Sequence, residues 1–256
     1  MALTLALLAL LCSAAQAITV TVDGANLPGE AIARGGTTYV PLVELLSAFG
    51  TETVLWDGDS RTAAAETALF TLTVPVGQRQ VLADGYAYPL SAPTLIHRDR
   101  TYVPLRAVAN LLGGQVRFQR WDLPIAVTTP SPAAYTDEDL YWLSRVISAE
   151  SRGESLLGQV AVGSVVLNRV ASDQFPDTIR EVVFDRKDAV QFEPVANGTI
   201  YQPPTDQSVL AAHLALNGVR PVEDCMYFFN PALSAGDWIR QNCQYHTTIG
   251  CHRFYR

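Results

Sequence analysis

Positive charge is scarce in this sequence of 256 residues, and Lys187 is its only lysine. Lysine and arginine together number 18 against 25 aspartates and glutamates, so the formal net charge is −7. Proteins that bind nucleic acid need a basic surface to neutralise phosphates. The composition therefore excludes nucleic acid as a main partner, and it provides no attraction to other anionic polymers, so any recognition of them must use shape and hydrogen bonds.

Long hydrophobic runs are equally scarce, because only residues 1–17 form one. The run ends in Ala15-Gln16-Ala17, a small-x-small pattern typical of a signal-peptide cleavage site, although no basic residue precedes it. A buried N-terminal helix is the alternative. The run is too short for a membrane span, and no later stretch approaches one. We expect a signal peptide at 1–17, followed by a secreted or wall-associated monomer without a membrane span.

Cysteine is the third scarce residue, with four copies, one of them inside the expected signal. Export permits a disulfide among Cys225, Cys243 and Cys251, but one thiol is left over. The apolar runs at 226–229 and 249–255 are expected strands, and antiparallel pairing would bring residues on them close together. We therefore predict a Cys225–Cys251 disulfide; a Cys225–Cys243 bond and three reduced thiols are the alternatives.

The same tail has a spacing that could hold zinc, formed by Cys243, His246, Cys251 and His252. Neighbouring residues of a strand point to opposite faces, which makes the adjacent Cys251-His252 pair awkward for tetrahedral ligation. We therefore predict no metal site and no cofactor.

A repeat dominates the first half of the sequence. Thr38–Leu42 reads TYVPL and recurs as Thr101–Leu105. Each copy continues into an apolar helical pattern, which ends at Gly50 in the first copy and at Gly113 in the second. A short strand that ends in Trp-Asp follows in both copies. Proline at the start and glycine just past the end are the expected punctuation of a helix. The repeat predicts two strand–helix–strand units, whose last strands lie at 54–57 and 116–122.

This half resembles the copper amine oxidase N-terminal-like domain, also called the stalk domain, over residues 18–129. The resemblance rests on the two TYVPL helices and their Trp-Asp strands. His97 is the only histidine of this segment, which has no cysteine, whereas copper sites require several imidazole or sulfur ligands. We therefore expect no copper site here. A Pro/Ser/Ala linker at 130–134 precedes a second domain at 135–256.

The second domain opens with a helix on whose apolar face a glutamate falls. Thr136 with Asp139 resembles a capping box, and the apolar stripe from Leu140 to Ile147 reaches Glu150 when extended by one turn. Burial and the negative end of a helix dipole both raise a carboxylic pKa, which suits a general acid. Pairing of Glu150 with Arg145 or Arg152 is the structural alternative, and Glu154 competes for the catalytic role.

Motifs along residues 135–256 closely resemble the SleB/CwlJ-type cell wall hydrolases, named for spore cortex-lytic enzymes. They are Arg145–Glu154, Gly158–Val170, Gln191–Val195, Tyr227–Pro231 and Ile249–Tyr255. The resemblance implies an α+β chain whose second domain is lysozyme-like and mainly helical. It also implies cleavage of peptidoglycan between N-acetylmuramic acid and N-acetylglucosamine, with Glu150 as the catalytic acid.

Four residues of these motifs are candidates for binding sugar, because amides bond acetamido groups and aromatic rings stack on sugar rings: Gln191, Phe192, Tyr227 and His252. A core role for the two aromatic residues is the alternative. A conventional hydrolase needs a second carboxylate, for which Glu193 and Asp237 are candidates in loop-like settings. Without one, the C6 hydroxyl of muramic acid can attack C1 and give a 1,6-anhydro product. A non-catalytic peptidoglycan-binding protein is the second hypothesis.

Overall fold

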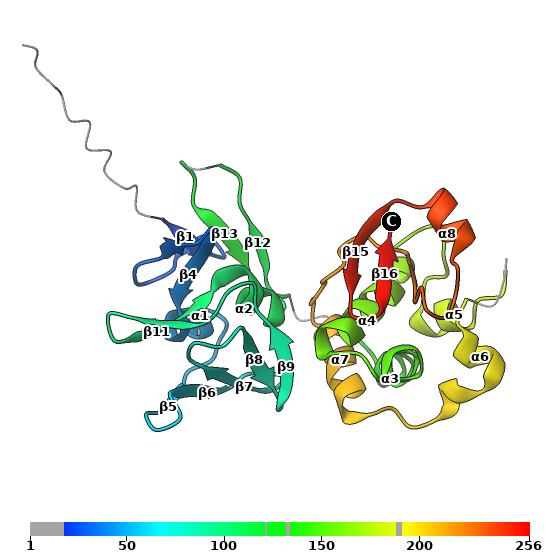
Figure 1. The fold of residues 1–256 in the computed structure, drawn as a ribbon, viewed down its shortest axis with the longest axis horizontal. Coiled ribbons are helices and arrows are strands. Elements are labelled where there is room, and N and C mark those ends of the chain that lie inside the picture. The colour runs from blue at the N-terminus through cyan, green and yellow to red at the C-terminus, as the bar shows by residue number, and fades with distance from the viewer. Residues whose placement is uncertain (1–17, 121, 132–133, 188–190) are drawn as a thin grey trace, which may run out of the picture.

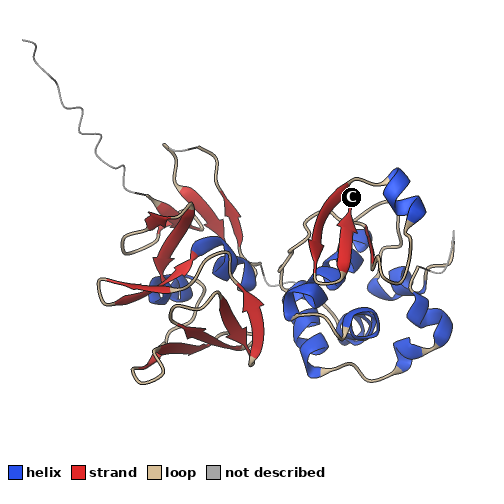
Figure 2. Cartoon of the chain, in the orientation of Figure 1, coloured by secondary structure: helices blue, strands red, loops and turns tan. Residues whose placement is uncertain are grey.

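The computed structural model describes residues 18–120, 122–131, 134–187 and 191–256, so the expected signal peptide lies outside the described residues. A β-rich half is followed by a half in which helices predominate (Figures 1 and 2). The mixed α and β composition predicted from the sequence is thus confirmed. Within the described residues, no helix combines the length and apolar character that crossing a membrane requires.

The two sequence repeats pair with each other at the centre of the N-terminal half. Strands β4 (Thr37–Pro41) and β11 (Arg100–Pro104) are antiparallel, with Val40 opposite Val103. Each runs directly into a helix, α1 (Leu42–Ala48) or α2 (Leu105–Leu111), whose N-cap is the repeat's proline. Gly50 and Gly113 follow the helices, both at a φ of 82° that favours glycine. The predicted strand–helix–glycine unit is confirmed in both copies.

Three sheets make up this half. Strands β3 (Ile32–Arg34) and β10 (Leu95–His97) flank the paired repeats. A five-stranded antiparallel meander contains β5 (Leu55–Asp57), β6 (Thr62–Glu66), β7 (Thr71–Pro75), β8 (Gln80–Ala83) and β9 (Tyr86–Pro89). The third sheet contains β1 (Val20–Val22), β2 (Ala25–Asn26), β12 (Gln115–Arg117) and β13 (Ile125–Thr128). The second Trp-Asp strand is therefore shorter than predicted: it ends at Arg117, and Trp121 lies outside the described residues.

The two ends of the N-terminal half meet. β1 pairs in parallel with β13, and the carboxylate of Asp23 accepts hydrogen bonds from the backbone N–H and hydroxyl of Thr129, at 3.0 and 2.6 Å. The hydrophobic core nevertheless continues into the C-terminal half, where α4 contacts β9. A Cβ at Gly113 would lie 2.4 Å from the carbonyl oxygen of Asn217, so the two halves approach closely there.

The C-terminal half begins with α3 (Asp137–Ser151). Thr136 and Asp139 form the predicted capping box, in which each side chain accepts from the other residue's backbone N–H. Helices α3, α4 (Leu156–Val170) and α7 (Asp206–Leu216) pack against one another around Val146, Ile147 and other fully buried aliphatic residues. The shorter elements are α5 (Ile179–Phe184), α6 (Glu193–Asn197), the 3₁₀ helix η1 (Thr199–Tyr201) and α8 (Asp237–Asn242).

A three-stranded antiparallel sheet closes the chain, in the order β14 (Tyr227–Phe229), β16 (His252–Tyr255), β15 (Tyr245–Ile249). The expected pairing of the two apolar runs is confirmed, since Tyr227 lies opposite Tyr255. Cys225 therefore lies beyond one end of β16, whereas Cys251 precedes its other end. At about 3.3 Å per residue the two cysteines are roughly 20 Å apart, far beyond the ~7 Å between Cα atoms that a disulfide allows. Cys225, Cys243 and Cys251, the cysteines among the described residues, are all free, so the predicted Cys225–Cys251 disulfide is wrong.

Candidate active site

Glu150 lies in the last turn of α3, on a partly exposed position beside the core residues Val146 and Ile147. Burial and, to a lesser degree, the neighbouring charge of Glu193 raise the pKa of its carboxyl, and Arg169 opposes the rise, so that the pKa lies at about 7. An upward shift was predicted from the place of Glu150 at the end of the apolar helical stripe. A carboxyl that keeps its proton near neutral pH can donate that proton to a leaving group.

Neither arginine considered as a structural partner pairs with Glu150 among the described residues. The guanidinium of Arg145 lies over the ring of Tyr141, with its carbon 3.6 Å from the ring centroid. Arg152 donates from Nε to the carbonyl of Ser148 at 3.4 Å. The structural alternative for Glu150 therefore finds no support in these contacts.

Arg169, near the end of α4, connects the surrounding segments. The residue is only 5% exposed, and its Nε donates to the carbonyl of Met226 at 2.8 Å. Its NH1 donates to Oε1 of Gln191 at 3.3 Å. Burial lowers the pKa of the guanidinium, and Tyr227, Asp185 and Glu150 partly offset this effect, so that the pKa lies at about 10. No motif in the sequence indicated the proximity of Arg169 to Glu150.

Three of the four proposed sugar-binding residues gather around Arg169. Its guanidinium carbon lies 5.3 Å from the ring centroid of Phe192 and 5.5 Å from that of Tyr227. Phe192 is 2% exposed, so it supports the site from the core. Gln191 and Tyr227 are partly exposed and can reach a ligand.

The two candidates for a second carboxylate differ in position. Glu193 is the exposed first residue of α6, and its charge acts on Glu150. Asp237 begins α8 and is also exposed. Of the two, only Glu193 has an electrostatic effect on the Glu150 carboxyl among the described interactions.

His252 does not join this cluster, contrary to the sequence prediction. Tyr227 lies opposite Tyr255, three residues along β16 from His252, so the side chains of His252 and Tyr227 point to opposite faces of the sheet. His252 is 6% exposed, its ring contacts Phe228, and its Nδ1 lies 3.8 Å from a carboxylate oxygen of Glu154. Its burial on the other face removes it from the residues that could line the site.

Glu154 has a different task from Glu150. Its two carboxylate oxygens accept the backbone N–H of Cys251 at 3.3 and 3.2 Å, in the turn between β15 and β16. Gly250 has a φ of 57°, and a Cβ there would collide with this carboxylate. Glu154 therefore anchors the C-terminal hairpin to the start of α4. These contacts give Glu154 a structural role, in place of the catalytic role for which it was an alternative candidate.

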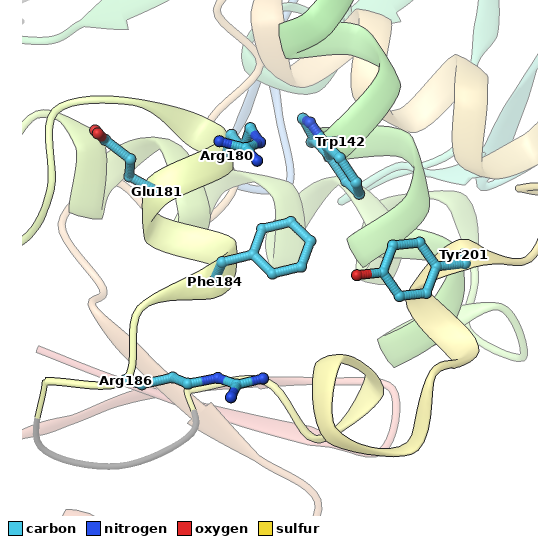
Figure 3. Close-up of a pocket in the computed structure, with 6 residues that line it drawn as sticks. All are labelled: Trp142, Arg180, Glu181, Phe184, Arg186 and Tyr201. Carbon is cyan, nitrogen blue, oxygen red and sulfur yellow. The ribbon is translucent and has the colours of Figure 1, made fainter.

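An open, aromatic-lined pocket of about 620 Å³ borders α3 at Trp142 (Figure 3). Trp142, Phe184 and Tyr201 form its walls, with ring centroids of Trp142 and Phe184 4.9 Å apart, and Arg180 and Arg186 border it. Trp142 precedes Glu150 by two helical turns, or about 12 Å of helix length. The pocket shares α3 and the α5–α6 connection with the site around Glu150.

A separate groove of about 940 Å³ lies in the N-terminal half. It is lined by polar and apolar residues of both repeats, among them Thr37, Thr38, Leu105, Arg106, Phe118 and Leu123. Phe118 and Leu123 are 45% and 41% exposed, so this half offers an apolar surface to a ligand.

Comparison with known proteins finds two matching families. Residues 21–122 match the copper amine oxidase N-terminal domain, and residues 153–255 match the Cell Wall Hydrolase family. The second match begins three residues after Glu150, so the role of this residue depends on the geometry above.

The C-terminal half is also similar to curated proteins. The spore cortex-lytic enzyme of Bacillus cereus is 39% identical over 126 residues, which are 49% of this chain and 47% of the relative. The chain thus spans about half the length of such relatives. The solved catalytic domain of the germination-specific lytic transglycosylase SleB from Bacillus anthracis is 37% identical, with a TM-score of 0.45, over 49% of this chain and all of that one.

A shorter relative is matched over most of its length. The cell wall hydrolase CwlJ of Halalkalibacterium halodurans is 33% identical over 102 residues, which are 38% of this chain and 70% of the relative. With the motifs identified in the sequence, this coverage shows that the chain belongs to the cell wall hydrolase family that includes the spore cortex-lytic enzymes.

Proposed function

We propose that the chain cleaves peptidoglycan glycan strands between N-acetylmuramic acid and N-acetylglucosamine, as a lytic transglycosylase with Glu150 as its general acid and base. The observation that carries this proposal is the carboxyl of Glu150, desolvated enough to raise its pKa to about 7 yet still partly exposed. The similarity to spore cortex-lytic enzymes and to a cell wall hydrolase supports the same class of substrate.

In the proposed reaction, Glu150 gives its proton to the glycosidic oxygen as the bond from C1 of muramic acid to that oxygen breaks. The C6 hydroxyl of the same sugar attacks C1, and the Glu150 carboxylate takes up the hydroxyl proton. The products are a 1,6-anhydro end and a free N-acetylglucosamine hydroxyl, so no water is consumed and Glu150 returns to its protonated state. Gln191 and Tyr227 bind the sugar, and Arg169 holds both in place.

Hydrolysis through Glu193 is the second candidate. Its charge acts on the Glu150 carboxyl, so the two acids are neighbours. Glu193 could activate a water molecule in the manner of a two-carboxylate glycosidase. Its exposed position at the start of α6 keeps it solvated, which disfavours this route.

Analysis of the products separates these reactions. Purified peptidoglycan digested with the chain is expected to release muropeptides with 1,6-anhydro-muramic ends, identified by mass spectrometry. Reducing muramic ends would establish hydrolysis instead. Intact strands that nevertheless retain bound protein would support the non-catalytic peptidoglycan-binding hypothesis.

The two halves divide the work in this proposal. Residues 135–256 carry the chemistry in a lysozyme-like arrangement of helices around Glu150, and residues 18–129 position the enzyme on the wall through the groove between the repeats. A signal peptide at 1–17 would bring the enzyme to this substrate outside the cell. The reaction itself uses side chains alone and requires neither a metal nor a cofactor.

The pH dependence of the reaction follows from the raised pKa of Glu150. The protonated carboxyl is the active form, so activity is present below the folded-state pKa and is lost as the pH rises through it. With that pKa at about 7, we expect kcat/KM to fall about tenfold per pH unit at higher pH. Initial rates of strand cleavage between about pH 5 and pH 9 measure this limb; a rate that still rises beyond pH 8 would contradict it.

The aromatic pocket is expected to hold a part of the strand distant from the scissile bond. Tyr201 is 61% exposed, so its replacement by alanine should leave the fold intact. Loss of an aromatic contact typically costs about 1–2 kcal/mol, which predicts roughly 5–30-fold weaker cleavage of long strands by Tyr201→Ala. Tyr245→Ala, at a 53% exposed aromatic residue of β15, is the matched control. Short oligosaccharides that end before the pocket should show no difference between the variants and the parent chain.

A further inference from the structure

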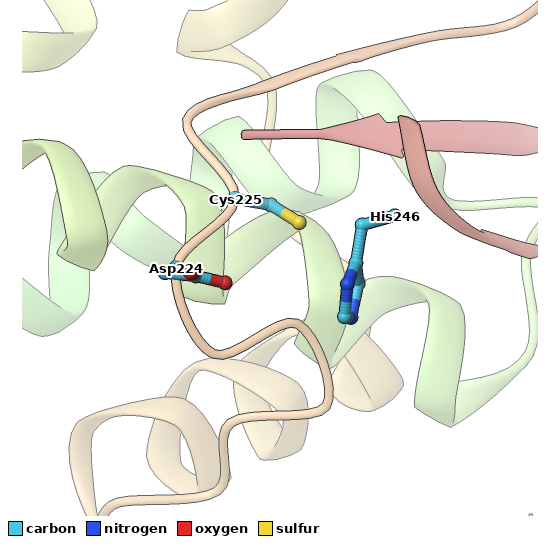
Figure 4. Close-up of side chains that lie close together, drawn as sticks. All are labelled: Asp224, Cys225 and His246. Atoms are coloured by element: carbon cyan, nitrogen blue, oxygen red, sulfur yellow. The ribbon is translucent and has the colours of Figure 1, made fainter. Parts of the chain in front are cut away.

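Three side chains with metal-binding atoms meet at one end of the C-terminal sheet. Asp224 and Cys225 lie just before β14, and His246 lies on β15. β14 and β15 border the two edges of β16, which brings these distant segments together. The carboxylate, sulfur and imidazole atoms all lie within 4.8 Å of one another, and Figure 4 shows the sulfur and the carboxylate pointing toward the imidazole.

We propose that Asp224, Cys225 and His246 bind a Zn²⁺ ion, with a water molecule as the fourth ligand. Thiolate, imidazole and carboxylate are the ligand types that zinc takes in a tetrahedral site, at about 2.0–2.3 Å from the metal. Ligand atoms at such distances are about 3.4–3.8 Å apart, so the present spacing must contract by about 1 Å. Rotation of the Asp224 and His246 side chains supplies this change, because neither is buried, whereas Cys225 is fully buried.

The cluster already stabilises a positive charge. Nε of Arg256 lies 2.6 Å from a carboxylate oxygen of Asp224, and the same guanidinium acts on the thiol of Cys225. The Arg256 side chain is 40% exposed, so it can turn into solvent when zinc takes its place. Arg256 is therefore a competitor of the metal, and its removal should tighten binding.

Zinc binding also requires that the thiol lose its proton. Burial raises the pKa of Cys225 to about 11, so the free thiol stays protonated at neutral pH. Coordination deprotonates it, a proton is released to solvent, and affinity therefore weakens as the pH falls. The neighbouring charges that bear on this equilibrium are Asp224 and Arg256.

This ligand set differs from the one considered in the sequence analysis. His246 is the only member of that earlier set in the cluster, because Cys251 and His252 lie at the opposite end of β16. Asp224 and Cys225 had no sequence spacing that linked them to His246, since pairing within the sheet brings them together. Zinc here would tie the two outer strands of the sheet together.

The test uses the untagged full chain, freed of metal and kept reduced, and titrated with zinc chloride in a calorimeter. One ion per chain is expected to bind, and at ~100-fold excess over Kd the Tm should rise by roughly 5–10 °C. Co²⁺ in place of zinc should give a thiolate charge-transfer absorption. Cys225→Ser and His246→Ala should lose these effects, Cys243→Ser should keep them, and Arg256→Gln should bind more tightly.

Controls keep the outcome clear. Thermal melts in EDTA check that the variants are as stable as the parent chain. If a variant is less stable, its loss of binding counts only when His246→Gln and Asp224→Asn also lose binding. Binding that persists in both Cys225→Ser and His246→Ala, or that disappears in Cys243→Ser, would overturn the proposal. So would the absence of zinc binding to the parent chain. None of these readouts depends on strand cleavage, so they are independent of the proposed function.

Discussion

Glu150→Gln is expected to abolish strand cleavage, reducing the rate by at least ~10²–10⁴-fold, the usual contribution of general acid catalysis. Glutamine keeps the shape of the side chain but has no proton to transfer. Release of muropeptides from purified peptidoglycan measures the loss. Activity within a few-fold of the parent chain would refute the assignment of Glu150.

The same substitution is expected to stabilise the fold at alkaline pH. The pKa of Glu150 is about 7 in the folded chain and near 4.5 when unperturbed, so the folded state holds its proton more tightly. Ionisation therefore costs stability progressively as the pH rises from 4.5 to 7, and the cost is complete above that window. For a partly exposed group this amounts to on the order of 1–3 kcal/mol, which Glu150→Gln should recover at pH 8 and not at pH 4.

Glu154→Gln is the matched control for Glu150→Gln. Its amide oxygen can still accept the N–H of Cys251, although the pairing with His252 is lost. We expect a lower Tm with cleavage reduced only a few-fold. A loss of activity as large as that of Glu150→Gln, with an unchanged Tm, would instead place Glu154 in the chemistry.

Local features of this chain were predictable because they depend on residues close in sequence. The capping box at Thr136, the proline-started helices of the repeats and the glycines after them all follow from backbone geometry within one turn. Glu150 was identified in the same way, from its place on an apolar helical stripe. The raised pKa then follows from that place, since a carboxyl at the end of a buried face loses water.

Features that depend on register or on distant contacts were not predictable from spacing. The apolar runs that follow Cys225 and surround Cys251 do pair, but the disulfide prediction failed because pairing alone does not fix which residues are opposite. The same register places His252 and Tyr227 on opposite faces of the sheet. Arg169 was missed because its partners Gln191, Met226 and Glu150 lie on three other segments, each distant from it in the sequence.

Arg169→Met is expected to reduce kcat/KM at least tenfold and to raise the pH at which activity is lost. Arg169 lowers the pKa of Glu150, so removing its charge lets that pKa rise and extends the protonated, active form to higher pH. The overall rate nevertheless falls, because Gln191 and the loop at Met226 lose the donors that position them. An upward shift of the alkaline limb is a result that a purely structural residue would not give.

Two further variants separate positioning from general stability. Arg169→Lys keeps the positive charge but not the planar fork that bonds Met226 and Gln191 together, so its alkaline limb should stay near that of the parent chain while its rate falls partly. Arg220→Met removes another largely buried arginine of the same half, which donates to the carbonyl of Ala215. Among the described residues, the charges that act on the Glu150 carboxyl are those of Glu193 and Arg169, so this control should lower the Tm and leave the pH profile unchanged. If Arg169→Met behaved like Arg220→Met, with a lower Tm and an unshifted limb, the electrostatic coupling between Arg169 and Glu150 would be disproved.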